Sequence, residues 1–197
     1  MSEETIYRVH DIAPRVFDTG ALTGVATTSI HLVHTDDGIA AWVSLTGAQI
    51  AECAGSYSPS WVFINSESGE PTTHDLSELT INLMASKFSI ALETNGSRYQ
   101  DCMKCMDWIT VSPKWRDTDN VDSLVVGISH EVKFVVSNVD ELRRSFDFVK
   151  RFHINPAYTI CLQPSDMSAE LMNMCYNTVI TMGWRLAVPL NRLITVN

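Results

Sequence analysis

The chain alternates between short apolar runs and longer stretches in which apolar residues recur every three or four positions. Short runs rich in β-branched or aromatic residues and bounded by turn residues predict strands. Such runs lie at 29–33, 61–65, 89–93, 107–111, 131–136, 159–163 and 185–188. Helical periodicity occurs at 46–54, 75–86, 139–152 and 168–182; the second stretch opens on an acidic cap and the last stops before Gly183. This alternation predicts an α/β protein with a mainly parallel sheet.

The length and composition are those of one globular domain. The chain has 197 residues, of which 45% are hydrophobic and 19% charged, and we expect a single domain over residues 1–197. No run of eighteen apolar residues exists, which excludes a transmembrane helix. The opening MSEETIYRVHD is acidic and lacks the apolar core of a signal peptide, so we expect a cytoplasmic protein.

The charge balance argues against nucleic acid as a partner. Fourteen basic and twenty-three acidic residues give a net charge of −9, which repels phosphate backbones at long range. A basic cluster occurs at residues 143–151, but on a predicted amphipathic helix such charges form the solvated face.

The five cysteines do not suggest a disulfide framework, because their number is odd. Cys161 lies in an apolar strand and Cys175 in an apolar helix, so both are predicted to be buried. Cys102 and Cys105 form a Cys-x-x-Cys pair and are weak metal candidates, because a structural zinc site needs a second pair that the sequence lacks. A thioredoxin-like redox role is also disfavoured, since no clear helix start follows the pair.

Polar residues follow five of the predicted strands, at 66–71, 94–96, 112–114, 163–164 and 189–192. The carboxyl ends of parallel strands lie at the same edge of a sheet, where the sites of such folds gather. We therefore expect one site at this edge.

Short motifs at and near these strand ends also resemble those of a known protein family. Ser-Gly-Glu-Pro at 68–71, Glu-Thr-Asn-Gly at 93–96, Asp-Trp-Ile-Thr-Val-Ser-Pro-Lys at 107–114, Glu-Val-Lys-Phe-Val-Val at 131–136, Leu-Gln-Pro at 162–164 and Gly-Trp-Arg-Leu at 183–186 occur in one order. In this order the chain, from about residue 10 to its end, resembles 7-carboxy-7-deazaguanine synthases. These are small radical S-adenosylmethionine (SAM) enzymes of queuosine and deazapurine biosynthesis. The resemblance implies an incomplete TIM-like barrel of mainly parallel strands, of the radical SAM type, and a homodimer.

The resemblance also implies a site. Gly69 and Glu70 are expected at the amino-acid end of SAM, while Glu93, Asn95, Ser112 and Lys114 line the SAM and substrate pocket and Gln163 closes it. Amide side chains suit purine edges, and lysine and serine suit carboxylates. The alternative is that 95–96 is only a turn and 112–113 only the end of a strand.

The cluster motif of that family is absent from the sequence. Radical SAM enzymes hold a [4Fe–4S] cluster through a Cys-x-x-x-Cys-x-x-Cys motif after the first strand, because iron–sulfur ligation needs soft thiolates. Here residues 31–42 read HLVHTDDGIAAW, in which 36–38 indicate an ordinary turn. His31 and His34 are three residues apart on a predicted strand, so one is expected inside the barrel and the other exposed. We therefore expect no catalytic residue, no [4Fe–4S] cluster and no other cofactor, with SAM binding in the residual pocket left open.

Three functions remain open from the sequence. The first is a non-catalytic homologue, or pseudoenzyme, that keeps the barrel to bind a nucleotide-like small molecule or a protein partner. The second is an enzyme of queuosine or 7-deazapurine biosynthesis with unusual cluster ligation. The third is a structural component of a larger assembly, which predicts a large apolar patch and an empty pocket.

Overall fold

The computed structural model describes residues 4–34, 41–66, 69–116, 118–155 and 158–193. Within these residues, nine strands form one sheet in the order β3-β1-β2-β4-β5-β6-β7-β8-β9. The strands are β1 (Ile6–Val16), β2 (Ala26–Leu32), β3 (Val43–Thr46), β4 (Trp61–Asn65), β5 (Ser89–Thr94), β6 (Trp108–Val111), β7 (Glu131–Val136), β8 (Thr159–Pro164) and β9 (Arg185–Leu186). All neighbours from β2 to β9 are parallel, whereas β1 pairs antiparallel with both β2 and β3. The predicted α/β class with a mainly parallel sheet is confirmed.

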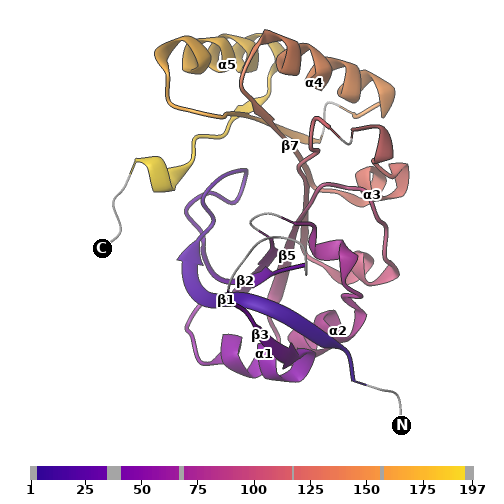
Figure 1. Cartoon of the computed structure of the whole chain (residues 1–197). Coiled ribbons are helices and arrows are strands. Elements are labelled where there is room, and N and C mark those ends of the chain that lie inside the picture. Colours follow the sequence, from indigo (N-terminus) through magenta and orange to yellow (C-terminus); the bar gives the residue numbers. More distant parts are fainter. Residues whose placement is uncertain (1–3, 35–40, 67–68, 117, 156–157, 194–197) are drawn as a thin grey trace.

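In the described part of the chain, five α-helices connect or flank these strands: α1 (Gly47–Gly55), α2 (Ser77–Ala85), α3 (Ser123–Ile128), α4 (Val139–Arg151) and α5 (Ala169–Met182). In Figure 1, α4 and α5 lie at one end of the curved sheet, α1 and α2 lie at the other, and α3 lies between them. Short 3-10 turns complete the chain: η1 (Pro71–Thr73), η2 (Asp101–Cys105), η3 (Thr118–Asn120) and η4 (Leu190–Arg192). None of the helices in the described part of the chain is long and apolar enough to cross a membrane.

The core is one continuous cluster that runs along the sheet and beneath the helices. It contains the apolar residues of the parallel strands, such as Ile64, Leu92 and Phe134, each of which is fully buried. Parallel strands covered on both faces read as nearly unbroken apolar runs, which explains why the sequence predicts them well.

The predicted helices and strands all occur, with ends shifted by up to three residues. Gly183 adopts the left-handed conformation, with φ of 69°, at the end of α5, as predicted. The start of α2 is two residues later than expected, and the Asp75 carboxylate accepts a hydrogen bond from the Ser77 N–H at 2.9 Å. Cys161 and Cys175 are buried, as predicted. His31 is buried on β2 and His34 is exposed, which also agrees with the sequence.

Three elements were not predicted: β1, β3 and α3. The β1 strand contains Pro14 and several charged residues, and only its first half alternates between buried and exposed positions. Proline inside a run argues against a central strand, yet here the strand belongs to a hairpin. The α3 helix has six residues and includes Gly127, too short for a visible helical period.

The two ends of the sheet are joined by the loop between β1 and β2. The Asp18 carbonyl accepts a hydrogen bond from the Leu190 N–H at 3.0 Å, and its carboxylate accepts one from the Asn191 N–H at 2.6 Å. The predicted site segment 189–192 therefore packs against this loop, which lies at the rim of the pocket described next.

Candidate functional site

Cavities lie at the carboxyl ends of β4 to β8, where the sequence predicted the site. The central cavity has a volume of about 260 Å³ and is bounded by residues 17–19 of the β1–β2 loop and by residues of β4 to β8. A smaller hollow adjoins it at the ends of β4 and β5, and a third cavity of about 320 Å³ adjoins it beside Trp115. Because neighbouring cavities share Ser112 and Lys114, they form one continuous depression, called here the strand-end pocket.

All seven predicted ligand-binding residues line the strand-end pocket, including Gln163 in its central cavity. Three lie only in the smaller hollow, namely Gly69, Glu70 and Asn95, and three are shared by the hollow and the central cavity, namely Glu93, Ser112 and Lys114. Ser68 and the predicted turn at 36–38 lie outside the described residues. The structure thus brings together residues almost one hundred positions apart, although their contacts to a ligand stay a prediction.

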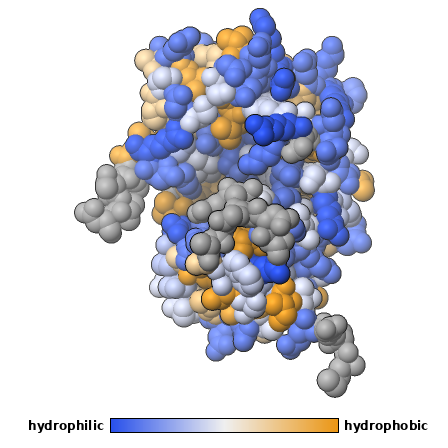
Figure 2. All heavy atoms as spheres, viewed as in Figure 1, coloured by the Kyte–Doolittle hydropathy of each residue, from blue (hydrophilic) through white to orange (hydrophobic). Residues whose placement is uncertain are grey.

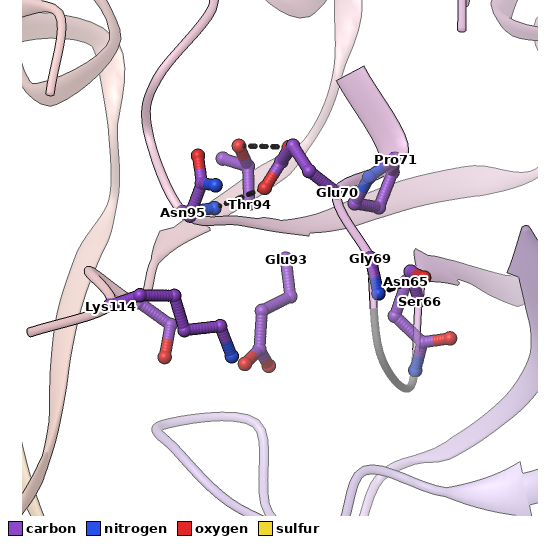
Figure 3. Close-up of a pocket in the computed structure, with 10 residues that line it drawn as sticks. Asn65, Ser66, Gly69, Glu70, Pro71, Glu93, Thr94, Asn95 and Lys114 are labelled. Atoms are coloured by element: carbon purple, nitrogen blue, oxygen red, sulfur yellow. Dashed lines mark hydrogen bonds between the residues drawn. The ribbon is translucent and has the colours of Figure 1, made fainter. Parts of the chain in front are cut away.

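Glu70 uses its carboxylate to hold two segments of the chain together. One oxygen accepts hydrogen bonds from the Thr72 N–H at 3.1 Å, the Thr72 hydroxyl at 2.8 Å and the Thr94 hydroxyl at 2.6 Å. The other oxygen accepts the Asn95 N–H at 2.6 Å (Figure 3). Four donors therefore meet one carboxylate, and Glu70 sets the shape of the smaller hollow.

Asn95 likewise has an internal role in its turn. Its side-chain oxygen accepts the Ser97 N–H at 2.7 Å. This is the Asx-type contact expected from the alternative that 95–96 is a turn. The turn and the pocket wall are therefore the same piece of chain.

Glu93 and Lys133 form an ion pair on the floor of the central cavity. The Lys133 ammonium lies 2.8 Å from the Glu93 carboxylate and donates a hydrogen bond to the Thr19 hydroxyl at 2.9 Å. The Lys133 side chain is only 6% exposed and that of Glu93 is 29% exposed. A buried lysine needs such a partner, because desolvation of an isolated charge is costly.

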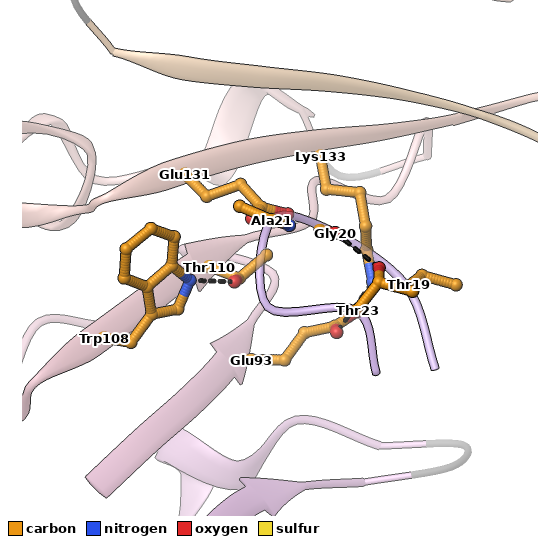
Figure 4. Close-up of polar contacts among 9 residues, drawn as sticks. All are labelled: Thr19, Gly20, Ala21, Thr23, Glu93, Trp108, Thr110, Glu131 and Lys133. Carbon is orange, nitrogen blue, oxygen red and sulfur yellow. Dashed lines mark hydrogen bonds and ion pairs between the residues drawn. The ribbon is translucent and has the colours of Figure 1, made fainter. Parts of the chain in front are cut away.

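Glu131 fixes the tip of the β1–β2 loop from the same face of β7 (Figure 4). Its carboxylate accepts the Ala21 N–H at 2.8 Å, and a side chain on Gly20 would place its Cβ 2.5 Å from a carboxylate oxygen. Gly20 also has a φ of +87°. Burial raises the pKa of Glu131, while the Ala21 N–H and the Lys133 ammonium act to lower it. Glu131 and Lys133, two positions apart on one strand, together hold the loop that forms one wall of the pocket.

Several polar groups in the strand-end pocket lack a protein partner. Within the described residues, the buried side-chain oxygens of Asn65 and Gln163 have no hydrogen-bond partner. No hydrogen bond or ion pair is formed by Lys114 with any described residue, and in Figure 3 its side chain points toward the same part of the pocket as Glu93. Buried acceptors of this kind normally find a donor, since an unmet one costs free energy.

An apolar wall faces these polar groups. The rings of Phe17 and Phe63, from the β1–β2 loop and β4, lie with centroids 4.9 Å apart. A cavity with one apolar wall, two amide acceptors and an unpaired cation suits a small flat molecule that carries N–H donors and one negative charge.

The thiolates that an iron–sulfur cluster needs are not found at this site. The carboxyl end of β2 continues into residues 33–42, which contain no cysteine. Cys161 and Cys175 are buried in the core, Cys53 lies on α1, and Cys102 and Cys105 lie on η2. Among the described residues, no three His, Cys, Asp or Glu side chains are grouped so that they could hold a metal ion. The donor set therefore does not fit a cluster.

The sequence did not predict the Phe17–Thr19 wall, Asn65 or Lys133. A signal for Lys133 exists, because Glu131 and Lys133 are charged residues on one face of an otherwise apolar strand. A charge in a strand buried on both faces needs a partner across the fold, and this can mark a site.

The fold belongs to a known class of incomplete α/β barrel. The structure superposes on the crystal structure of QueE from Escherichia coli with a TM-score of 0.81, covering 93% of both chains at 23% sequence identity. The mostly parallel sheet thus forms an incomplete barrel like the one in that structure.

Sequence comparison leads to the same group of proteins. Over 128 residues the chain is 29% identical to the 7-carboxy-7-deazaguanine synthase of Buchnera aphidicola subsp. Schizaphis graminum, and over 130 residues it is 29% identical to that of Escherichia coli K12. Each match covers 65% of this chain, and the chain spans 57% and 58% of the length of these curated relatives. No family model matches the sequence.

Proposed function

We propose that this protein is a non-catalytic homologue of 7-carboxy-7-deazaguanine synthase, which keeps the barrel for binding and does not cleave SAM. The observation that carries the proposal is that the pocket residues are present whereas the cysteines of the cluster motif are absent. The strand-end pocket keeps Glu93, Ser112, Lys114 and Gln163. The segment in which the thiolates of a radical SAM enzyme would stand contains no cysteine.

A fold can keep its core after its chemistry is lost, because packing residues and site residues are largely separate sets. The loss of the cluster thiolates removes the open iron that chelates SAM and the electron that cleaves it. No step through a cluster is therefore assigned to this chain. What remains is a pocket that can bind and orient a small molecule.

The pocket favours a small ligand over a purely structural role. The unpartnered oxygens of Asn65 and Gln163 can accept hydrogen bonds from N–H donors of a ligand, and the Lys114 ammonium can bind an anionic group. A deazapurine carboxylate or the amino-acid end of SAM offers such groups. On the face shown in Figure 2, hydrophobic residues occur in small groups among hydrophilic ones, which does not support a large docking patch on that face.

Anaerobic reconstitution with iron and sulfide tests the loss of chemistry. The Escherichia coli synthase, treated in parallel, serves as the positive control. We expect no visible cluster absorption from this chain and only background iron after desalting. Absorption with about four irons per chain would overturn the proposal and favour an enzyme with unusual ligation.

Calorimetry tests the binding half of the proposal. SAM and 7-carboxy-7-deazaguanine are titrated separately into the wild type, Lys114→Ala and Lys150→Ala. Lys150 is an exposed lysine on α4, distant in sequence and absent from the pocket lining. We expect at least one ligand to bind the wild type and Lys150→Ala equally and Lys114→Ala about tenfold more weakly, a difference of about 1.4 kcal/mol. If neither ligand binds, the barrel serves a protein partner, and the ligand-binding part of the proposal is wrong.

A further inference from the structure

The Cys-x-x-Cys pair lies in a backbone conformation that brings its two residues together. Cys102 and Cys105 are at the second and last positions of η2, a 3-10 helix. Such a helix has three residues per turn, so side chains at i and i+3 are eclipsed, with their Cα atoms about 6 Å apart. Disulfide-bonded cysteines have Cα atoms about 4.4–6.8 Å apart. Both cysteines are free thiols in this structure.

The two thiols differ in their access to solvent. Cys105 is exposed, whereas Cys102 is half-buried and packs against the hydrophobic core. Burial raises the pKa of the Cys102 thiol, while the nearby hydroxyls of Thr80 and Ser77 on α2 act to lower it. An exposed thiol beside a sheltered one is the arrangement of an attacking and a resolving cysteine.

We propose that Cys102 and Cys105 are a reversible modification site that closes to an intramolecular disulfide. The oxidant is a low-molecular-weight disulfide. The Cys105 thiolate attacks one sulfur of that disulfide, forms a mixed disulfide and releases the first small thiol. The Cys102 thiolate then attacks the Cys105 sulfur and releases the second small thiol. Two protein thiols are oxidised by two electrons, and one small disulfide is reduced to two thiols, which take up the two protons.

The modification site is linked to the strand-end pocket through Gln100. The Cys102 thiol donates to the Gln100 side-chain oxygen at 3.6 Å, and this oxygen also accepts the Leu76 N–H at 2.9 Å. The Gln100 amide group donates to the carbonyls of Thr72 at 2.9 Å and His74 at 2.6 Å.

Thr72 connects Gln100 to the pocket residue Glu70. Its backbone N–H and hydroxyl both donate to Glu70, which in turn holds Asn95. Disulfide formation removes the thiol hydrogen of Cys102 and tightens the turn that follows Gln100. We therefore expect oxidation to loosen the backbone around Asn95.

Exposure of the full chain to oxidised glutathione tests the disulfide. We expect the wild type to lose two hydrogens in mass, and peptide mapping to join residues 102 and 105 within one chain. In Cys102→Ser, the mixed disulfide should accumulate on Cys105, and in Cys105→Ser neither product should form at these positions. Cys53→Ser, in which a half-buried cysteine of α1 is removed, should behave as the wild type.

Two results would overturn the modification site. One is a wild type that stops at the mixed disulfide or links two chains instead. The other is a Cys102→Ser variant that takes up no glutathione, because Cys105 would then not be the attacking thiol.

Hydrogen exchange of the backbone amides tests the link to the pocket. The Asn95 and Ser97 amides should exchange at least about threefold faster in the oxidised chain, while amides of α4 keep their rates. Unchanged exchange at both positions would refute the link. Neither experiment needs a ligand, so their failure is distinct from failure of the proposed function.

Discussion

The two sides of the strand-end pocket differ in how their polar groups are satisfied. At the ends of β4 and β5, the carboxylate of Glu70 meets four donors of the chain itself. In the central cavity, which Glu70 does not line, Lys114 and the side-chain oxygens of Asn65 and Gln163 have no hydrogen-bond partner among the described residues. Glu93, between them, is paired with Lys133.

This difference separates residues that set the shape of the pocket from residues that can bind. A saturated carboxylate would have to give up internal hydrogen bonds before it could accept a ligand donor, and each such loss costs free energy. An unpartnered oxygen or ammonium exchanges only water for the ligand. Residues on the saturated side should therefore affect stability when changed, and residues on the open side should affect binding.

Gly20→Ala should have the largest effect, because it breaks the fixed wall of the pocket. The new Cβ would lie 2.5 Å from the Glu131 carboxylate, and φ at this position is +87°. Strain and overpacking together should lower the free energy of unfolding by about 3 kcal/mol. Urea denaturation measures this change.

Gly24→Ala is the matched control for the wall. Gly24 has a φ of +86° in the same loop, but, apart from Gly24 and its two chain neighbours, no described residue has an atom within 4 Å of the position of its Cβ. The control should therefore show only the backbone cost, about 1 kcal/mol. Equal losses in the two variants would mean that the contact with Glu131 contributes nothing.

Glu70→Ala should have the next largest effect. It leaves the Thr72 and Asn95 N–H groups and the hydroxyls of Thr72 and Thr94 without their acceptor. We expect a loss of about 2 kcal/mol in the free energy of unfolding, since buried donors without acceptors are costly. Glu52→Ala, at an exposed position on α1, should change it by less than about 0.5 kcal/mol. A Glu70→Ala chain as stable as this control would contradict the assignment of Glu70 to pocket shape.

The sequence predicted the parallel part of the fold better than the hairpin. Residues 61–65 were assigned with correct bounds because this stretch is a nearly continuous apolar run between turn residues. Residues 131–136 were also assigned with correct bounds, although the charged Glu131 and Lys133 interrupt the apolar run. The β1 strand was missed because Pro14 argues against a strand when the local sequence is considered alone. The strand forms through its antiparallel pairing with β2, which the local sequence does not indicate.

The site divides in the same way. Motif residues such as Glu70 and Lys114 stand next to strand ends and could be found from order along the chain. The bond from Lys133 to Thr19 joins residues 114 positions apart, and no local pattern encodes it. Nor could the sequence show that the Glu70 carboxylate is fully hydrogen-bonded whereas the Lys114 ammonium is not. That difference depends on which donors and acceptors the fold brings close to each side chain.

Titration of Glu131, which holds the β1–β2 loop at the pocket wall, should have a smaller effect on stability. Burial raises the pKa of Glu131 above its ordinary value of 4.5, with Glu93 adding to the rise and Lys133 opposing it. At a pH between 4.5 and the raised pKa, Glu131 keeps its proton in the folded chain but has lost it in the unfolded chain. Rising pH therefore destabilises the fold through this window, and the effect is complete above the raised pKa.

Glu131→Gln removes this titration and isolates its contribution. Its amide oxygen can still accept the Ala21 N–H, so the loop contact is kept. Urea denaturation of both proteins from about pH 4 to pH 8 should show the wild type losing stability relative to the variant as pH rises. A constant difference across this range would show that burial of Glu131 carries no titratable cost.

Lys114→Ala should have the smallest effect on stability, and it separates the two sides of the pocket most sharply. Lys114 is exposed and no described residue pairs with its ammonium, so its removal should change the free energy of unfolding by less than about 0.5 kcal/mol. Glu70→Ala, which changes another residue that lines the smaller hollow, should lose several times more. Denaturation of the two variants side by side therefore checks the comparison without any ligand. If Lys114→Ala proves as destabilising as Glu70→Ala, the lysine has a structural partner in the folded chain, and the open side of the pocket would be saturated like the other.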